Sequence, residues 1–249
     1  MEEHLPRFFV AATAGRGDRL RLDPQEAKHV RVRRLRVGDR VAVFDGQGHS
    51  YAAVIDSVTR NEVAVVVTEQ RPEMMAESPL SLTLAMALLK ADRMEWVIEK
   101  ATELGVTRVL PFVSRYSLAR PSAKRRARWS EIARSAAKQS GRSLLPRVEE
   151  SVDLAAVFEE PADQRVLLWE GSTTVDAATL GDGVGRPASA LVVVGPEGGF
   201  SPEEATAAEQ SGCRLTAFGP RILRAETAAI AALAMCQFLW GDVGPRLRP

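Results

Sequence analysis

The hydrophobic and polar positions of the chain follow one pattern before about residue 70 and another after about residue 80. In the first part, apolar residues alternate with polar ones or form short runs, as in RVAVFDG, SYAAVIDSV and EVAVVVTEQ. These patterns predict strands, and Asp45-Gly46 followed by Gly48 predicts a hairpin turn. The prolines of RPEMMAESPL, residues 71–80, interrupt the pattern. We expect a small β domain over residues 1–72 and a second domain over residues 78–249.

In the second part, stretches typical of strands alternate with stretches that have the period of a helix. The strands are apolar on both faces, which is typical of a mostly parallel α/β sheet covered by helices. Ser201, Pro202 and Glu204 form a capping-box signature, and Gly212 follows the end of that helix. The sequence predicts strands at 82–89, 106–113, 165–170, 190–195 and 214–219, and helices at 94–104, 124–139, 202–211 and 225–240.

The last predicted helix, Ala225 to Trp240, is apolar nearly all round. Such a helix needs burial on several sides at once. A subunit interface would supply the additional side.

Composition excludes several classes of protein. The longest apolar run, Ala228 to Cys236, is far shorter than the roughly 20 residues that span a bilayer. The N-terminus has no charged-then-apolar signal pattern. The two cysteines, Cys213 and Cys236, lack the spacing of a zinc site or a disulfide framework. We therefore expect a cytoplasmic protein that binds no metal and no membrane.

The net charge of +1 conceals two basic segments. Residues 115–142 carry nine basic residues against one acidic residue, and residues 28–40 carry six against one. Clustered cations suit a polyanionic partner bound over an extended surface. Two solvated faces without a ligand are the alternative.

Three glycine-containing segments follow predicted strands, at residues 167–172, 194–200 and 218–227. Ligands of parallel sheets bind beyond the carboxyl ends of the strands, so these segments are candidates for a nucleotide site. None matches GxGxxG or GxxxxGK[ST], and Glu170, Glu197 and Glu226 would repel a pyrophosphate. A cationic cofactor without phosphate, such as S-adenosylmethionine, fits these segments. Tight turns in a purely structural sheet are the alternative.

The segments VGPEGGFSPEE and FGPRILRAETAAIAAL, in this order and spacing, resemble the RsmE family of 16S rRNA methyltransferases of the SPOUT class. The matches extend over almost the whole chain, although Arg33 stands where the family usually has an apolar residue. The resemblance implies a PUA-like β-barrel RNA-binding domain over residues 1–72 and a trefoil-knotted SPOUT α/β methyltransferase domain over residues 78–249. It also implies a homodimer that uses S-adenosylmethionine to methylate N3 of one uridine in the 16S rRNA of the small ribosomal subunit. Further matching segments are PRFFV, HVRVRRLRVGDRVAVFDGQG, ALLKADRMEWVIEKATELGV, PFVSRYS and AAKQSGRSLLP.

The resemblance also implies where the cofactor binds. The backbone around Glu170 and Gly171 would flank the adenine or ribose, and the glycines of the second segment would permit close approach. Glu197 either faces the cofactor or accepts backbone N–H bonds within its own turn. The implied cofactor-binding residues are Leu168, Glu170, Gly171, Gly195, Pro196, Glu197, Gly198, Gly199, Phe218, Gly219, Ile222, Leu223, Ala225 and Thr227.

For this reaction, Arg224 and Glu226 are the candidate catalytic residues. Loss of the N3 proton places negative charge on the carbonyl oxygens of the base, which a fixed cation at Arg224 would stabilise. Arginine stays protonated, so it is not the base. Glu226 would orient Arg224 or accept the proton through water. A structural salt bridge between the two at a helix start is the alternative.

The basic segments supply candidate RNA contacts on both domains. Such contacts hold phosphates and position the RNA, while the shape of the RNA and an extruded base determine specificity. For His29, a role as a hydrogen-bonded surface residue is favoured over a catalytic role. The candidate RNA-binding residues are Arg7, Lys28, His29, Arg31, Arg33, Arg34, Lys90, Arg93, Arg115, Lys138 and Arg142.

Two other functions are compatible with parts of this pattern. One is a non-catalytic rRNA-binding protein with a vestigial cofactor site, which binding of S-adenosylmethionine would distinguish from an enzyme. The other is a P-loop or dinucleotide enzyme, against which the missing lysine and the missing GxGxxG argue.

Overall fold

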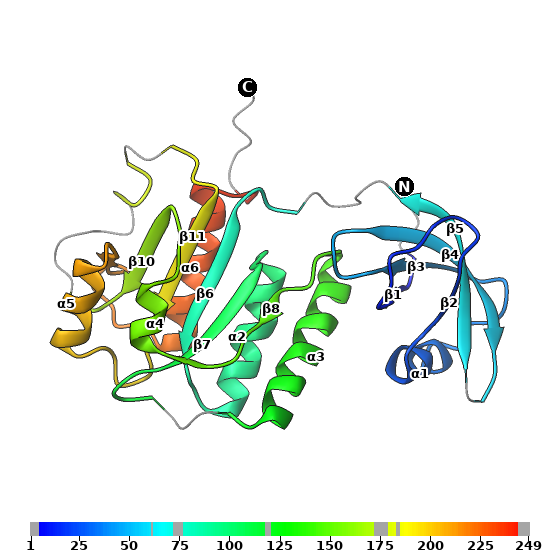
Figure 1. Ribbon diagram of the computed structural model, residues 1–249, viewed down its shortest axis with the longest axis horizontal. Coiled ribbons are helices and arrows are strands. Elements are labelled where there is room, and N and C mark those ends of the chain that lie inside the picture. The colour runs from blue at the N-terminus through cyan, green and yellow to red at the C-terminus, as the bar shows by residue number, and fades with distance from the viewer. Residues whose placement is uncertain are drawn as a thin grey trace. The chain divides into compact units, whose positions relative to one another are not determined.

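The computed structural model describes residues 5–60, 62–71, 77–117, 121–171, 179–182 and 185–243. The chain forms two compact units, Met1–Glu77 with Arg134–Leu145, and Ser78–Ala133 with Pro146–Pro249 (Figure 1). The domain boundary expected between residues 72 and 78 falls mostly on residues 72–76, outside the described part. Residues 134–145 belong by contact to the first unit, which the sequence did not predict.

The first unit contains a five-stranded sheet in the order β1-β3-β4-β5-β2. Strand β1 pairs with β3 in parallel, and the other pairs are antiparallel. Gly46 and Gly48 have φ of +76° and +107°, as the predicted turn between β3 and β4 requires. The strands are β1 (Arg7–Phe9), β2 (Arg19–Arg21), β3 (Arg40–Phe44), β4 (Ser50–Val58) and β5 (Val63–Arg71).

Helix α1 (Pro24–Val32) interrupts this sheet domain and was not predicted. Asp23 is its N-cap and accepts a hydrogen bond from the backbone N–H of Glu26, and Pro24 occupies the first turn. A capping aspartate followed by proline is a helix-start signal, but it was hidden by the β-rich pattern on either side. Ala27 and Val30 bury the inner face of this helix in the core of the first unit.

The C-terminal part of helix α3 (Ala123–Ser140) supplies basic side chains to the first unit. The Arg134 guanidinium lies 2.7 Å from the Asp23 carboxylate, and Lys138 Nζ lies 2.9 Å from Glu26 Oε2. Because the Glu26 side chain is only 1% exposed, its charge requires a partner such as Lys138. Some basic residues of the segment 115–142 therefore form ion pairs within the first unit.

The second unit contains a sheet in the order β12-β10-β11-β6-β7-β8, with β9 paired to β7. Every strand pair described in this sheet is parallel, as predicted. Its strands are β6 (Ser81–Ala87), β7 (Arg108–Val113), β8 (Arg147–Val148), β9 (Val152–Asp153), β10 (Gln164–Leu168), β11 (Ser189–Val194) and β12 (Arg214–Thr216).

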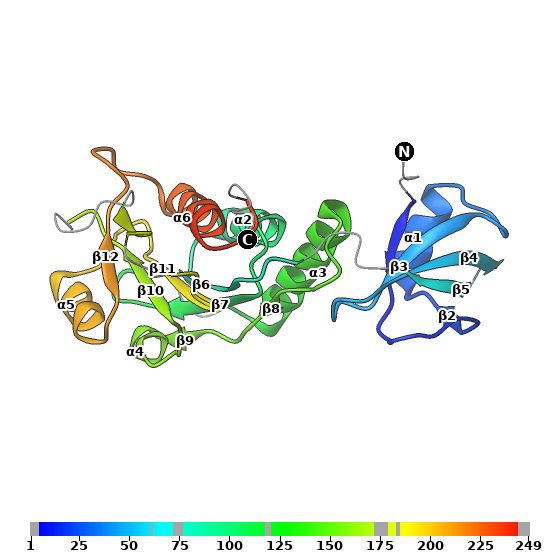
Figure 2. The same cartoon turned by 90° about the horizontal axis from the view of Figure 1, so that it is seen from above.

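Helices cover both faces of this sheet. Figure 2 shows α2 (Ala91–Glu103) and α6 (Ala225–Leu239) on one face and α4 (Leu154–Phe158) on the other. In β11, Val192 packs in the cluster with α2 and α6, whereas Leu191 and Val193 pack in the cluster with α4 and α5 (Pro202–Gln210). Burial on both faces explains why these strands are continuously apolar.

The structure confirms the predicted helices and strands of the second unit, with small shifts at their ends. Helix α5 begins with the predicted capping box between Ser201 and Glu204. Gly105 and Gly212 have φ of +80° and +89° just after α2 and α5, where glycine ends a helix without steric cost. The two- and five-residue elements β8, β9 and α4 were not predicted.

Both cysteines are buried, as expected for small apolar side chains. Burial raises the pKa of Cys236 to about 12. Among the described residues, no cluster of histidine, cysteine and carboxylate side chains could hold a metal ion. No helix in the same part of the chain is long and apolar enough to cross a bilayer.

Candidate functional site

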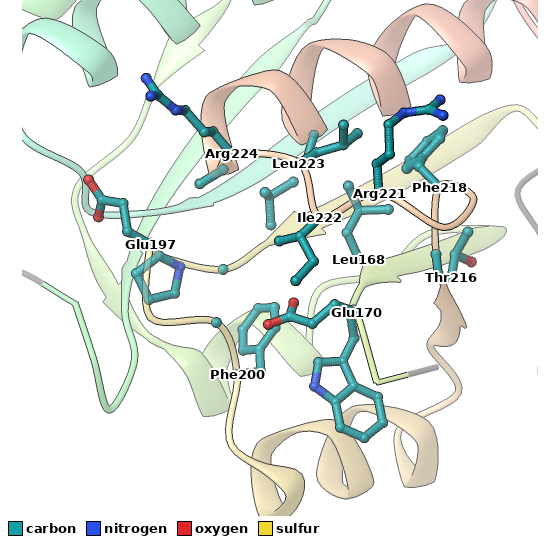
Figure 3. Close-up of a pocket in the computed structure, with 18 of the residues that line it drawn as sticks. Leu168, Glu170, Glu197, Phe200, Thr216, Phe218, Arg221, Ile222, Leu223 and Arg224 are labelled. Atoms are coloured by element: carbon teal, nitrogen blue, oxygen red, sulfur yellow. The ribbon is translucent and has the colours of Figure 1, made fainter. Parts of the chain in front are cut away.

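A pocket of about 420 Å³ opens at the carboxyl ends of three adjacent strands, β10, β11 and β12. The segments that follow these strands form its walls, which brings together the three glycine-containing segments singled out in the sequence (Figure 3). The Trp169 backbone N–H donates a 3.0 Å hydrogen bond to the Thr216 carbonyl, which joins the first and third segments. The pocket therefore follows from the parallel order of the strands.

The segment after β11 turns tightly at the pocket wall. Gly199 donates a 2.9 Å backbone hydrogen bond to the Pro196 carbonyl and has φ of +71°, a conformation that favours glycine. A Cβ atom on Gly199 would lie 2.9 Å from Glu170 Oε1, and one on Gly195 would lie 3.0 Å from the Phe200 ring. Side chains at either position would occupy space that the wall residues now fill.

The segment after β12 carries both apolar and basic side chains over the pocket. The Ile222 side chain is 84% exposed, although it belongs to the pocket lining. Arg224 is the N-cap of α6, and its side chain makes no ion pair or hydrogen bond within the described part of the chain. Figure 3 draws Arg224 and Glu197 toward one end of the pocket, and Arg221 and Phe218 toward the other.

Arg93, from the first turn of α2, also lines the pocket. Its Nη1 atom lies 2.9 Å from Glu197 Oε1, and its Nε atom lies 3.7 Å from Glu226 Oε1. The sequence analysis predicted that Arg93 binds RNA. For Glu197 it gave two alternatives, that the side chain faces the cofactor or that it accepts backbone N–H bonds within its own turn. Glu197 lines the pocket, and its carboxylate accepts the observed hydrogen bond from Arg93.

Most predicted cofactor-binding residues line this one pocket, and so does Arg224. Gly171, Gly198, Glu226 and Thr227 do not line it, and the observed ion-pair partner of Glu226 is Arg93 and not Arg224. The pocket residues that the sequence interpretation missed lie within two residues of predicted ones, so the neighbours of each predicted residue, including the last residues of the strands and the first turn of α6, were candidates. They are Trp169, Val194, Phe200, Thr216, Ala217, Pro220, Arg221 and Ala228.

The candidate RNA-binding residues divide into exposed and internal side chains. Arg7 donates a 2.8 Å hydrogen bond to the Arg142 carbonyl, and burial lowers the pKa of Arg7. Arg142 is 5% exposed and pairs with Glu77 at 2.9 Å, and Lys138 Nζ lies 2.9 Å from the half-buried His29 ring. These residues stabilise the first unit. The exposed candidates are Lys28, Arg31, Arg33, Arg34, Lys90 and Arg115.

Comparison with known proteins gives consistent matches over both units. A family model described as an RNA methyltransferase domain matches residues 76–237, and one described as an RNA methyltransferase PUA domain matches residues 22–68. The chain is 34% identical to ribosomal RNA small subunit methyltransferase E of Synechocystis, over 84% of this chain and 69% of that one. It is 29% identical to the Bacillus subtilis protein of the same name, over 94% and 96%.

A solved structure is similar over nearly the whole chain. Ribosomal RNA small subunit methyltransferase E from Neisseria gonorrhoeae, bound to S-adenosyl methionine, superimposes with a TM-score of 0.88 at 33% identity, over 96% of this chain and 99% of that one. Sequence and fold thus agree, and the chain belongs to the family of the ribosomal RNA small subunit methyltransferases E.

Proposed function

We propose that this protein transfers a methyl group from S-adenosylmethionine to N3 of a uridine in the 16S rRNA of the small ribosomal subunit. The observation that carries the proposal is the convergence of three segments, predicted from sequence as cofactor-binding, on one pocket. Relatives named for methylation of small-subunit rRNA support the substrate. The similar structure from N. gonorrhoeae, which contains S-adenosyl methionine, supports the cofactor.

The residues of the pocket fit this cofactor. Its volume of about 420 Å³ lies within the range of small-molecule sites. The turn at Gly199 lets the Glu170 carboxylate pack directly against the backbone, since a Cβ atom there would lie 2.9 Å from Glu170 Oε1. The carboxylate of Glu170, which lines the pocket, suits a cationic sulfonium and opposes a pyrophosphate. Leu168 and Phe218 provide apolar surface for the adenine ring.

When bound, the cofactor would supply an activated methyl group. The protein must hold that base in line for displacement, which is mainly a matter of positioning. Arg224 stabilises the negative charge that develops on the carbonyl oxygens of the uracil ring as N3 loses its proton to solvent water. We assign catalysis to Arg224 and not to Glu226, because Glu226 does not line the pocket and its observed ion pair is with Arg93.

Exposed basic side chains on each unit provide phosphate contacts for the RNA. On the first unit, Lys28, Arg31, Arg33 and Arg34 lie in or just after α1. On the second unit, Lys90 precedes α2 and Arg115 follows β7. These contacts position the RNA without reading its sequence.

A non-catalytic rRNA-binding protein would use the same basic surface but would not need the pocket. Its walls retain the glycine turn and an unpaired Arg224, which favours an enzyme. Binding of S-adenosylmethionine separates the two functions.

The proposed reaction is tested by incubating the protein with labelled S-adenosylmethionine and small ribosomal subunits that lack the modification. We expect label in 16S rRNA as N3-methyluridine, identified by mass spectrometry of the digested RNA. Free 16S rRNA in a parallel reaction identifies which form is the substrate. Label on another base, or no label with either substrate, would contradict the proposal.

We further propose that the protein is a homodimer that buries the outer surfaces of α2 and α6. Trp96 on α2 and Phe238 on α6 are 42% and 55% exposed, although both side chains are large and apolar. Such side chains at a helix surface favour contact with a second copy.

Replacement of Phe238 by aspartate is expected to convert the dimer to a monomer, because a charge in an apolar interface loses its hydration. Light scattering of the wild type and the variant measures the mass. Val37→Asp, which changes an equally exposed apolar residue of the first unit, is the control and should leave the mass unchanged. A monomeric wild type would refute the dimer.

A further inference from the structure

Arg93 connects three segments that are far apart in the sequence. It belongs to the first turn of α2, whereas Glu197 lies in the turn after β11 and Glu226 in the first turn of α6. One guanidinium contacts both carboxylates, with Nη1 2.9 Å from Glu197 and Nε 3.7 Å from Glu226. A planar guanidinium with several donors is suited to two carboxylates at once, whereas an ammonium acts as a single point charge.

Glu226 depends strongly on this contact. Its side chain is 14% exposed, and its Oε2 atom is buried without a hydrogen-bond partner among the described residues. A carboxylate in such surroundings is stabilised mainly by a nearby cation, and the ion pair that we observe for it is the one with Arg93. Without Arg93, Glu226 would lose this partner, and Glu197 would lose the hydrogen bond that holds it.

The contact also joins residues in or next to two walls of the pocket. Glu197 belongs to the wall formed by residues 194–200, and Glu226 immediately follows the wall residues Arg224 and Ala225. Segments at the edge of a sheet are more mobile than the strands that carry them. The ion pairs of Arg93 join both walls to α2 and restrict this motion. They also engage the carboxylates of Glu197 and Glu226, which could otherwise form ion pairs with Arg224.

We propose that Arg93 is a positioning residue of the cofactor site: its guanidinium holds Glu197 and Glu226 together, which fixes the spacing of the two pocket walls and leaves Arg224 unpaired for the RNA substrate. This role rests on the proposed methyltransferase function. It differs from a direct contact between Arg93 and RNA, the role that the sequence suggested.

The test compares Arg93→Gln, Arg93→Lys and the control Lys100→Gln. Lys100 is on the same helix and also contacts two carboxylates, Glu99 at 2.7 Å and Glu103 at 2.8 Å, but it does not line the pocket. Calorimetry gives the Kd for S-adenosylmethionine. Methyl transfer to small subunits gives kcat and the KM for RNA, and thermal unfolding reports stability.

We expect Arg93→Gln to raise the Kd for S-adenosylmethionine by about tenfold. Arg93→Lys should recover part of this loss, since an ammonium replaces only one of the two contacts, and Lys100→Gln should bind as the wild type does. The double variant Arg93→Gln/Glu226→Gln should bind no more weakly than Arg93→Gln, because the two residues act as one unit.

Three outcomes would overturn the role of Arg93 while the wild type still binds the cofactor and methylates RNA. In the first, the Kd of Arg93→Gln for S-adenosylmethionine is unchanged. In the second, Arg93→Gln raises only the KM for RNA. In the third, Lys100→Gln loses as much cofactor affinity and stability as Arg93→Gln does. A wild type that binds no S-adenosylmethionine would overturn both this role and the proposed function.

Discussion

Replacement of Gly199 by valine is expected to raise the Kd for S-adenosylmethionine by about 100-fold or more, which corresponds to a loss of about 2.7 kcal/mol of binding free energy. The backbone at Gly199 has φ of +71°, which a β-branched residue adopts only with strain. The new side chain would also start 2.9 Å from the Glu170 carboxylate and extend the wall into the pocket. Backbone strain and the loss of pocket space both weaken cofactor binding, and calorimetry measures the Kd for S-adenosylmethionine.

A matched variant separates the loss of space from the strain. Gly212 has φ of +89°, and a Cβ atom there would meet nothing within 4 Å. Gly212→Val should therefore lower the unfolding free energy by about 1–3 kcal/mol, as Gly199→Val does, but leave cofactor binding intact. Equal loss of affinity in both variants would mean that stability, and not the pocket, was changed.

Replacement of Arg224 by alanine is expected to slow methyl transfer by about 100-fold or more at saturating substrates, if its charge stabilises the developing negative charge on the uracil ring. Binding of S-adenosylmethionine should change little, because the Arg224 side chain makes no contact that shapes the pocket among the described residues. Single-turnover kinetics on small subunits measures the chemical step, and calorimetry measures the affinity for the cofactor.

Two further variants identify what Arg224 contributes. Arg224→Lys keeps the charge but loses the planar fork, so an intermediate rate is expected. Arg186→Ala removes an exposed arginine of the same unit that does not line the pocket, and should react at the wild-type rate. A wild-type rate for Arg224→Ala would remove this residue from the mechanism.

Local sequence patterns predicted the second unit well and the first unit less well. The strands of the parallel sheet are buried on both faces, so their sequences are continuous apolar runs that are easily recognised. Helix α5 has a capping box that depends only on neighbouring residues. Helix α1 was missed because its polar surface and basic residues masked a buried face of few apolar side chains, Ala27 and Val30 among them.

The pocket that we propose for the cofactor was predicted from sequence because its walls follow directly from strand ends. Once the sheet is parallel, the segments after β10, β11 and β12 must emerge at the same edge. The resemblance to the methyltransferase family identified the residues in these segments, and twelve positions predicted for binding or catalysis line the pocket. They are Leu168, Glu170, Gly195, Pro196, Glu197, Gly199, Phe218, Gly219, Ile222, Leu223, Arg224 and Ala225. The trefoil knot implied by the same resemblance stays a prediction.

The sequence by itself determined the parallel sheet, its helices and the family, because each of these depends on short-range patterns or on contiguous motifs. Only the tertiary structure decided which charges are paired. Arg93 and Glu226 are separated by more than a hundred residues, and so are Lys138 and Glu26. Whether a basic residue binds RNA or stabilises the fold depends on which carboxylate is within a few ångströms, and that distance exists only after the chain has folded.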